Sequence, residues 1–243
     1  MQLRGCMLAL VLLSATAATA QIPDKFTNLQ FHPPDLTRAE LMTVMRNFSF
    51  ALNVRCQHCH VGGDGVSFEG VEFDKDSPNK EKARFMLRMT KNLNENILTG
   101  IPDRDQPALE IQCKTCHRGQ SKPMLLSQEM RASLDSDGAE AAVARYRELR
   151  NDFERAGAFD FGEWEVNTLA EVLAQEGRPR DAIAIYELNA EFHADSSSIA
   201  LSLGNLYETV EDKDAAIRSY ERARAPAQSR ARAKAARGVA AMT

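Results

Sequence analysis

The chain has 243 residues, which is enough for one large domain or two small ones. Its residues are 44% hydrophobic and 26% charged, and its formal net charge is −4. This composition is typical of a water-soluble globular protein, and the lack of a basic excess argues against nucleic acid as a partner.

Residues 1–20 have the pattern of a secretory signal peptide. Arg4 precedes an apolar run that ends at Leu13, and small residues follow up to Ala20, which predicts cleavage before residue 21. The apolar run is too short to cross a bilayer, so we expect no transmembrane span in the mature chain. The pattern predicts an exported protein, which in a bacterium means the periplasm.

A first helix is predicted over residues 38–53. Thr37 and Glu40 have the spacing of a capping box, in which each side chain bonds to the backbone of the other residue. Apolar residues then recur at helical spacing up to Leu52.

A second helix is predicted after a loop. Residues 61–77 are rich in Gly and Asp, which predicts the loop. Ser77 followed by Pro78 is typical of a helix start, with Ser as the cap and Pro at the first position. The helical pattern stops near Gly100.

Each predicted helix is followed by a C-x-x-C-H motif, which attaches c-type haem. The two thiols add to the vinyl groups of one porphyrin, and the adjacent His becomes the proximal ligand of the iron. The two motifs hold four of the five cysteines, and their wide separation argues against a zinc site. We therefore predict two covalently attached haem c groups, bound by Cys56, Cys59, His60, Cys113, Cys116 and His117.

Two methionine pairs are candidates for the distal iron ligands. Met42 and Met45 share a face of the first predicted helix, and Met86 and Met89 share a face of the second. A helical Met is more often a core residue than a ligand, but a pair stands ahead of each motif. The spacing alone leaves open which member of each pair binds iron.

The remaining histidines are interpreted as non-ligands. We expect His58 to be an exposed loop residue, although it could in principle ligate a neighbouring haem. His32 is expected to lie on the surface, and His193 to end a repeat helix.

The C-terminal half has a different pattern, with a period of 34 residues. Three residues recur at this spacing: Leu169, Ala182 and Tyr186 return as Leu203, Ala216 and Tyr220. A period of this length is typical of tetratricopeptide helix pairs. The Ala- and Arg-rich residues 229–243 predict a capping helix. A basic run from Arg218 to Arg237 is either a solvated face or a contact for an acidic partner or an anionic membrane surface.

Both motifs and the helices before them resemble the photosynthetic reaction-centre cytochrome c subunit family. The helical segments that carry this resemblance are Leu36–Met45 and Ala83–Thr90. That family carries four haems in helix–turn–C-x-x-C-H units, and the resemblance covers about residues 34–122, the first two units. It implies that Met45 and Met86 are the distal ligands.

These observations predict an all-α fold, with a small di-haem cytochrome c domain followed by a tetratricopeptide-like array. The expected boundaries are a signal peptide over 1–20, the di-haem domain over 21–125, a linker over 126–137 and the repeats over 138–243.

The leading hypothesis is an electron carrier rather than an enzyme. Met/His ligation fills both axial positions of each haem and leaves no open site for a substrate. The repeats would then hold a redox donor or acceptor on their concave face. The alternatives are a haem peroxidase or gas sensor with one open distal site, and a repeat scaffold in which the haems are structural.

Overall fold

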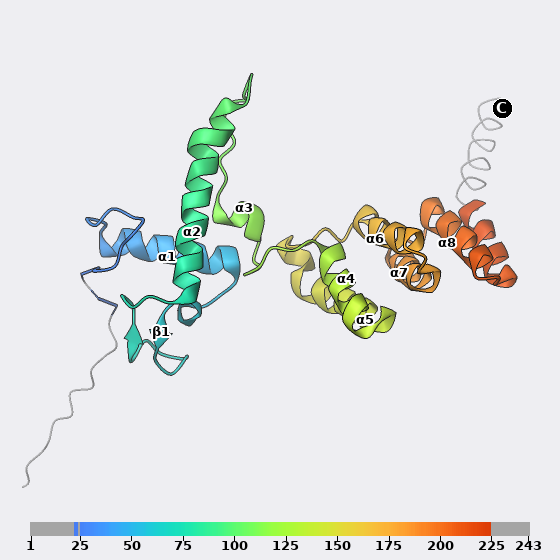
Figure 1. The fold of residues 1–243 in the computed structure, drawn as a ribbon, viewed down its shortest axis with the longest axis horizontal. Helices are drawn as coiled ribbons and strands as arrows, with labels where there is room; N and C mark the ends of the chain where they lie inside the picture. Colours follow the sequence, from blue (N-terminus) through green and yellow to red (C-terminus); the bar gives the residue numbers. More distant parts are fainter. Residues whose placement is uncertain (1–21, 24, 225–243) are drawn as a thin grey trace, which may run out of the picture. The chain divides into compact units, whose positions relative to one another are not determined.

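The computed structural model describes residues 22, 23 and 25–224, and it divides the chain into two compact units, Met1–Gln112 and Cys113–Thr243. The predicted signal peptide and the predicted capping helix lie outside the described residues. The described part is mostly helical, as expected (Figure 1).

The first helix of unit 1 is α1 (Arg38–Leu52). The Thr37 hydroxyl accepts a hydrogen bond from the backbone of Glu40, and the Glu40 carboxylate accepts one from the backbone of Thr37 at 2.9 Å. The predicted capping box is confirmed. The helix ends at Asn53, which adopts the left-handed conformation and turns the chain toward the first motif.

The long helix of unit 1 is α2 (Pro78–Asn92), which starts at the predicted cap, Ser77. It continues into a π-helical turn (Leu93–Ile97) and a 3-10 turn (Leu98–Gly100). Helical structure therefore reaches Gly100, as the sequence predicts.

The segment between α1 and α2 is not only loop. Strands β1 (Val61–Gly62) and β2 (Val71–Glu72) pair in an antiparallel ribbon, with Val61 opposite Glu72. The expectation of an all-α fold misses this ribbon. Strands of this length carry too little pattern to stand out from a glycine-rich loop.

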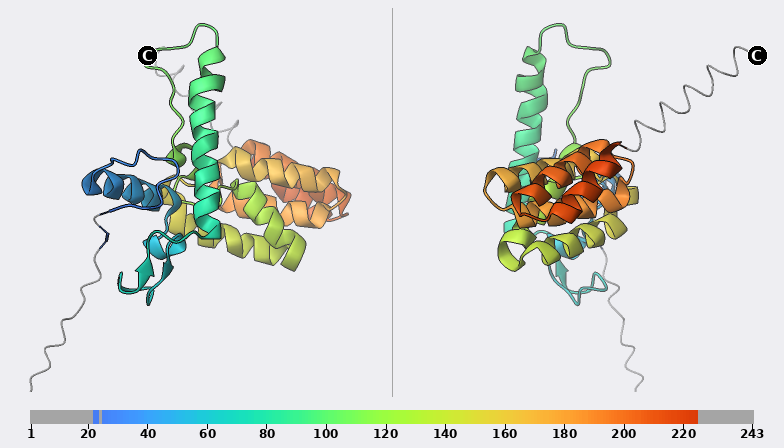
Figure 2. Two further views of the ribbon diagram at one scale, coloured as in Figure 1. Left: turned by 60° about the vertical axis from the view of Figure 1, so that its left-hand side comes forward. Right: turned by 90° about the vertical axis from the view of Figure 1, so that its right-hand side faces the viewer.

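Unit 2 begins with the second motif on a short helix, α3 (Cys113–His117). Five longer helices follow: α4 (Leu126–Asp137), α5 (Ala139–Phe153), α6 (Glu163–Gln175), α7 (Pro179–Phe192) and α8 (Ser197–Thr209). Another helix spans residues 213–224. Within this unit α4 packs on α5, α6 on α7 and α7 on α8, so that the helices form neighbouring layers (Figure 2).

The expected linker over 126–137 is wrong, because these residues form α4. Leu126, Met130 and Leu134 recur every fourth residue on one face of α4, and all three are buried in the core of unit 2. The unit boundary also differs, since it falls between Gln112 and Cys113 rather than after residue 125.

The two units differ in how much apolar core they have. The described core cluster lies in unit 2, from Leu126 to Leu206, and includes the repeat positions Leu169 and Leu203. In the described part of unit 1, the buried hydrophobic residues are Leu41 and Ala51. Unit 1 is instead built around a cavity.

Candidate functional site

A cavity of about 330 Å³ in unit 1 brings together the first motif and the first methionine pair. Cys56, Cys59 and His60 line it, and so do Met42 and Met45 from α1. The thiols, the predicted proximal ligand and both candidates for the distal ligand therefore share one site, although they come from two separate stretches of chain.

The cavity wall is largely apolar. Its aromatic and aliphatic residues come from the coil before α1, from α1 and α2, and from the loop between the two helices; they include Leu41, Phe48, Leu52, Phe68, Phe73 and Leu87. A porphyrin has two large apolar faces, so a wall of this kind suits it. The donor set also fits haem c, because two free thiols, an imidazole and a thioether are the groups that attach and ligate it.

The imidazole of His60 is oriented by the backbone. Its Nδ1 donates to the carbonyl oxygen of Phe73 at 3.2 Å, and the Phe73 ring lies 5.0 Å away, centroid to centroid. A proton held on Nδ1 leaves the lone pair of Nε2 for a metal. Burial, together with the Lys80 ammonium, keeps the pKa of His60 below its ordinary value, which favours the neutral imidazole that an iron ligand requires.

The start of α2 holds the first motif in place. The hydroxyl of Ser77, which caps α2, donates to the carbonyl oxygen of Cys59 at 2.6 Å. Asn79 donates through Nδ2 to the carbonyl oxygen of His58 at 2.8 Å. These contacts fix the backbone of the motif against the start of α2.

The two thiols of the first motif are close in sequence but form no disulfide bond. A 3-10 turn, η1 (Cys56–His58), allows the carbonyl of Cys56 to accept from the backbone N–H of both Cys59 and His60. Burial raises the pKa of the Cys59 thiol, and the Lys80 charge opposes this only in part. At neutral pH this site therefore presents a protonated thiol.

The histidine of the second motif is oriented in the same way as His60. His117 is buried on α3, and its Nδ1 donates to the carbonyl oxygen of Gln120 at 2.8 Å. Gln120 is itself anchored, because its Nε2 donates to the carbonyl oxygen of Ala158 at 2.9 Å. Both motif histidines thus have Nδ1 bound to a backbone carbonyl and Nε2 left for a metal.

The thiols of the second motif differ in exposure. Cys113 is half-buried, and burial raises the pKa of its thiol, whereas Cys116 is exposed. Met86 and Met89 lie on α2 in unit 1, while Cys113, Cys116 and His117 open unit 2. The pairing of Met86 with His117 stays a prediction.

His32 is not the surface residue that the sequence suggested. Its ring lines the cavity of unit 1, lies edge-on to Phe31 with centroids 5.3 Å apart, and approaches Phe48. Its Nε2 is buried without a hydrogen-bond partner, and burial lowers the pKa of the ring. Nothing in the coil sequence around it signals this, because the contact with Phe48 comes from a helix later in the chain.

The other two histidines lie where their backbone segments suggested. His58 ends η1 and is partly exposed. His193 caps the end of α7, as expected, and its Nε2 is buried without a partner.

Sequence reasoning also missed the acceptors of the two proximal histidines. Phe73 and Gln120 act through backbone carbonyls, which no side-chain pattern reveals. Ser77 was recognised as a helix cap, but its second contact, with Cys59, was not.

Two further features bear on function in the described residues. No group of three or more His, Cys, Asp or Glu side chains there is placed to hold a metal ion. Within residues 22, 23 and 25–224, no helix has the length and apolar character needed to span a bilayer.

Comparison with known proteins points to the same part of the chain. Residues 17–132 match the family described as "Photosynthetic reaction centre cytochrome C subunit". The chain is 33% identical over 101 residues to the photosynthetic reaction center cytochrome c subunit of Rubrivivax gelatinosus, a match that covers 37% of this chain and 26% of that protein. It is 32% identical over 83 residues to cytochrome c-554 of Chloroflexus aurantiacus, covering 34% of this chain and 18% of that protein.

The chain thus spans about a quarter of the first relative and less of the second. No solved structure has a significant match. The matched residues include both C-x-x-C-H motifs and both methionine pairs, so this part of the chain is similar to multihaem c-type cytochromes, and its two motifs fit two haems.

Proposed function

We propose that the protein is an exported di-haem c-type cytochrome that transfers single electrons between redox partners. The observation that carries this proposal is the cavity of unit 1, which gathers two thiols, a proximal imidazole and a thioether within one apolar wall. Each of these groups has a defined part in binding haem c, and together they form a complete set of attachments and axial ligands.

In the first site, Cys56 and Cys59 would hold the porphyrin through thioether bonds, and His60 would be the proximal ligand. Met45 would be the distal ligand, a choice over Met42 that rests on the family resemblance, since both line the cavity. Bound haem would supply one-electron chemistry at its iron. Two protein ligands leave no coordination position for a substrate, so the residues bind, orient and exclude water rather than act as acids or bases.

In the second site, Cys113, Cys116 and His117 would attach and ligate the haem, with Met86 as the distal ligand. The support is the shared arrangement of the two proximal histidines, because His117 donates to a backbone carbonyl as His60 does. Met86 is preferred to Met89 only through the family resemblance.

Unit 2 would dock the redox partner. Its helix pairs, α6 with α7 and α8 with residues 213–224, carry the 34-residue period, and the repeated residues Leu169 and Leu203 are both buried. Such pairs stack as tetratricopeptide-like layers and leave an extended surface for a partner. Trp164 on α6 and Leu201 on α8 are 70% and 51% exposed and are candidates for that contact.

Export is part of the proposal, because c-type haem is attached outside the bacterial cytoplasm and residues 1–20 have the pattern of a signal peptide. The periplasm is therefore the expected location, and peripheral contact with the membrane surface through the basic C-terminal residues is compatible with it.

The test is a spectrum of the mature protein, produced together with a haem-attachment system. We expect two covalently bound haems per chain, both low-spin, with the weak near-infrared band of sulfur-ligated ferric iron. The reduced protein should not respond to carbon monoxide. A high-spin component that binds carbon monoxide would instead favour the peroxidase or gas-sensor hypothesis.

A further inference from the structure

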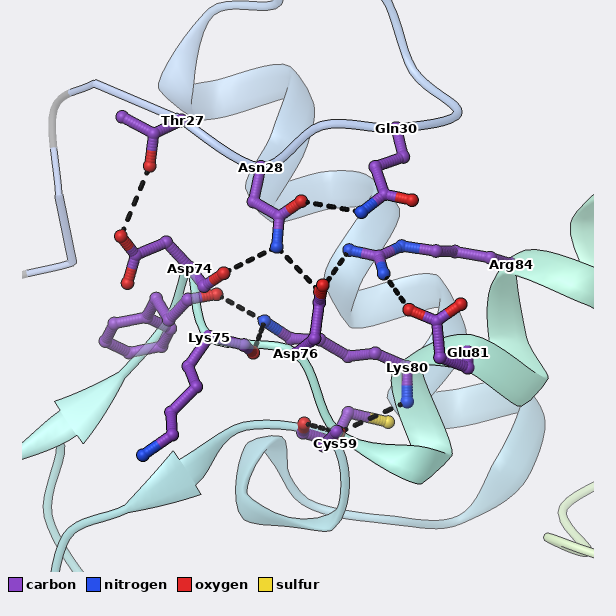
Figure 3. Close-up of polar contacts among 12 residues, drawn as sticks. Thr27, Asn28, Gln30, Cys59, Asp74, Lys75, Asp76, Lys80, Glu81 and Arg84 are labelled. Carbon is purple, nitrogen blue, oxygen red and sulfur yellow. Dashed lines mark hydrogen bonds and ion pairs between the residues drawn. The ribbon is translucent and has the colours of Figure 1, made fainter.

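The carbonyl oxygen of Phe73 accepts hydrogen bonds from two side chains. His60 donates to it through Nδ1 at 3.2 Å, and Lys80 donates to it through Nζ at 2.6 Å. The same ammonium group donates to the carbonyl oxygen of Lys75 at 2.5 Å. Lys80 thus reaches from the start of α2 to the loop before it (Figure 3). Its charge lies one carbonyl away from the proposed proximal histidine, His60.

The position of Lys80 is unfavourable for a lysine in two respects. It lies in the first turn of α2, where the helix dipole disfavours a cation. Its side chain is also partly buried, and burial lowers the pKa of its ammonium group. The helix itself therefore gives no reason for a lysine at this position, whereas the contacts of Lys80 with the loop carbonyls do.

The ammonium group of Lys80 donates its hydrogen bonds to the backbone rather than to the neighbouring carboxylates. Asp76 Oδ1 is bound by Arg84 at 2.8 Å and by Asn28 at 2.7 Å. Asp74 and Asp76 are near enough to favour the charged form of Lys80. Both acceptors of its Nζ are nevertheless main-chain carbonyls, so the positive charge is directed at the group that binds His60.

We infer that Lys80 is a positioning residue that raises the reduction potential of the first haem by acting through the Phe73 carbonyl on His60. A carbonyl that binds an ammonium group is a weaker acceptor for a second donor. The imidazole then keeps more of its Nδ1 proton, is a less basic ligand, and stabilises ferric iron less. The positive charge near the iron also favours the ferrous state, so both effects act in the same direction.

This inference rests on the proposed function, and α2 offers a matched control for its test. Lys82 lies two positions after Lys80, and its Nζ donates to the side chain of Asn79 at 3.4 Å, in an exposed position. Lys80→Met and Lys82→Met remove the same charge from the same helix. Only the first removes the ammonium group from Phe73.

The experiment is redox potentiometry of the holoprotein, combined with NMR of the reduced form to follow the Nδ1 proton of His60. Lys80→Met should lower the midpoint potential of one haem and move the His60 Nδ1 proton downfield, as its hydrogen bond strengthens. Lys82→Met should change neither, and Lys80→Arg should stay close to the wild type. If Lys80→Met does not assemble, Lys80→Gln takes its place, because it keeps a polar side chain and loses the charge.

Several outcomes would overturn the inference. A Lys80→Met protein with two haems and unchanged potentials would mean that Lys80 only tethers the loop. A lowered potential with an unmoved His60 proton would mean that the ammonium acts elsewhere, for example on a haem propionate. A wild-type protein without covalent haem would contradict the proposed function itself, which separates the two failures.

Discussion

Gly204 on α8 lies directly against the ring of Tyr220. A Cβ atom added to Gly204 would overlap Cε1 of this ring and would lie 2.6 Å from Cδ1 and 2.8 Å from Cζ. The backbone of α8 can therefore approach the next helix this closely only without a side chain at residue 204. The hydroxyl of Tyr220 donates to Asn205 at 2.9 Å, which fixes the ring in this position.

We predict that Gly204→Ala destabilises unit 2 by about 1–3 kcal/mol, the usual effect of overfilling a packed contact. The measurement is the free energy of unfolding from a urea titration. Gly100→Ala is the control, because a Cβ there would meet nothing within 4 Å. Equal stability of Gly204→Ala and the wild type would mean that the helices separate easily and that this contact does not set their spacing.

The choice between Met45 and Met42 gives a second prediction. Met45→Ala should remove the near-infrared band of one haem and allow the reduced protein to bind carbon monoxide, because it opens an axial position. Met42 lines the same cavity, and Met42→Ala should leave the spectrum unchanged. The opposite result for these two variants would mean that Met42 is the distal ligand and that the family resemblance misassigns it.

Parts of the fold that depend on local chemistry could be predicted from the sequence. Thr37 with Glu40, and Ser77 with Pro78, act within one helical turn, and both helix starts are confirmed. The C-x-x-C-H motif is equally local, because one short turn presents both thiols and the histidine.

Features that depend on contacts between distant segments could not be predicted. The ring of His32 packs against Phe48 of α1, and its own coil sequence does not indicate this. The helix α4 carried a usable signal, since Leu126, Met130 and Leu134 recur every fourth residue. The Pro and Gly residues just before it suggested a linker instead. The position of Lys80 was another usable signal. The helix dipole disfavours a cation in the first helical turn, so a lysine there indicates contacts outside the helix.

A third prediction concerns the different cores of the two units. Replacing all four motif cysteines by Ala prevents haem attachment, and unit 1 has little apolar core of its own in its described part. We expect unit 1 to lose its fold and unit 2 to keep it, because the core from Leu126 to Leu206 needs no cofactor.

Limited proteolysis followed by mass spectrometry tests this prediction, with circular dichroism as a second measure. Cleavage of the cysteine-free variant should concentrate before residue 113, and a fragment that contains α4 to α8 should resist. A native-like circular dichroism spectrum and uniform resistance would contradict the view that haem completes the interior of unit 1.

The last prediction concerns the pH dependence of unit 2. Asp135 on α4 binds two guanidinium groups, Arg178 at 2.7 Å and Arg131 at 2.6 Å, and these contacts lower the pKa of its carboxyl group below the ordinary 3.8. A carboxylate whose pKa falls on folding stabilises the fold above its unfolded pKa, and this contribution is lost as the pH falls through the folded pKa. The stabilisation should therefore be complete at pH 5 to 7 and should disappear in the acid range below about 4.

Asp135→Asn removes this carboxylate with little change of shape. The variant should be less stable than the wild type at pH 7, and the difference should shrink toward zero in acid, as measured by urea titrations at several pH values. Asp137→Asn removes one charge from the end of the same helix, where the carboxylate accepts a hydrogen bond from the neighbouring Ser136. It is the control for a general charge effect. A difference between wild type and Asp135→Asn that stayed constant down to low pH would mean that packing of the side chain, and not its charge, connects α4 to Arg178.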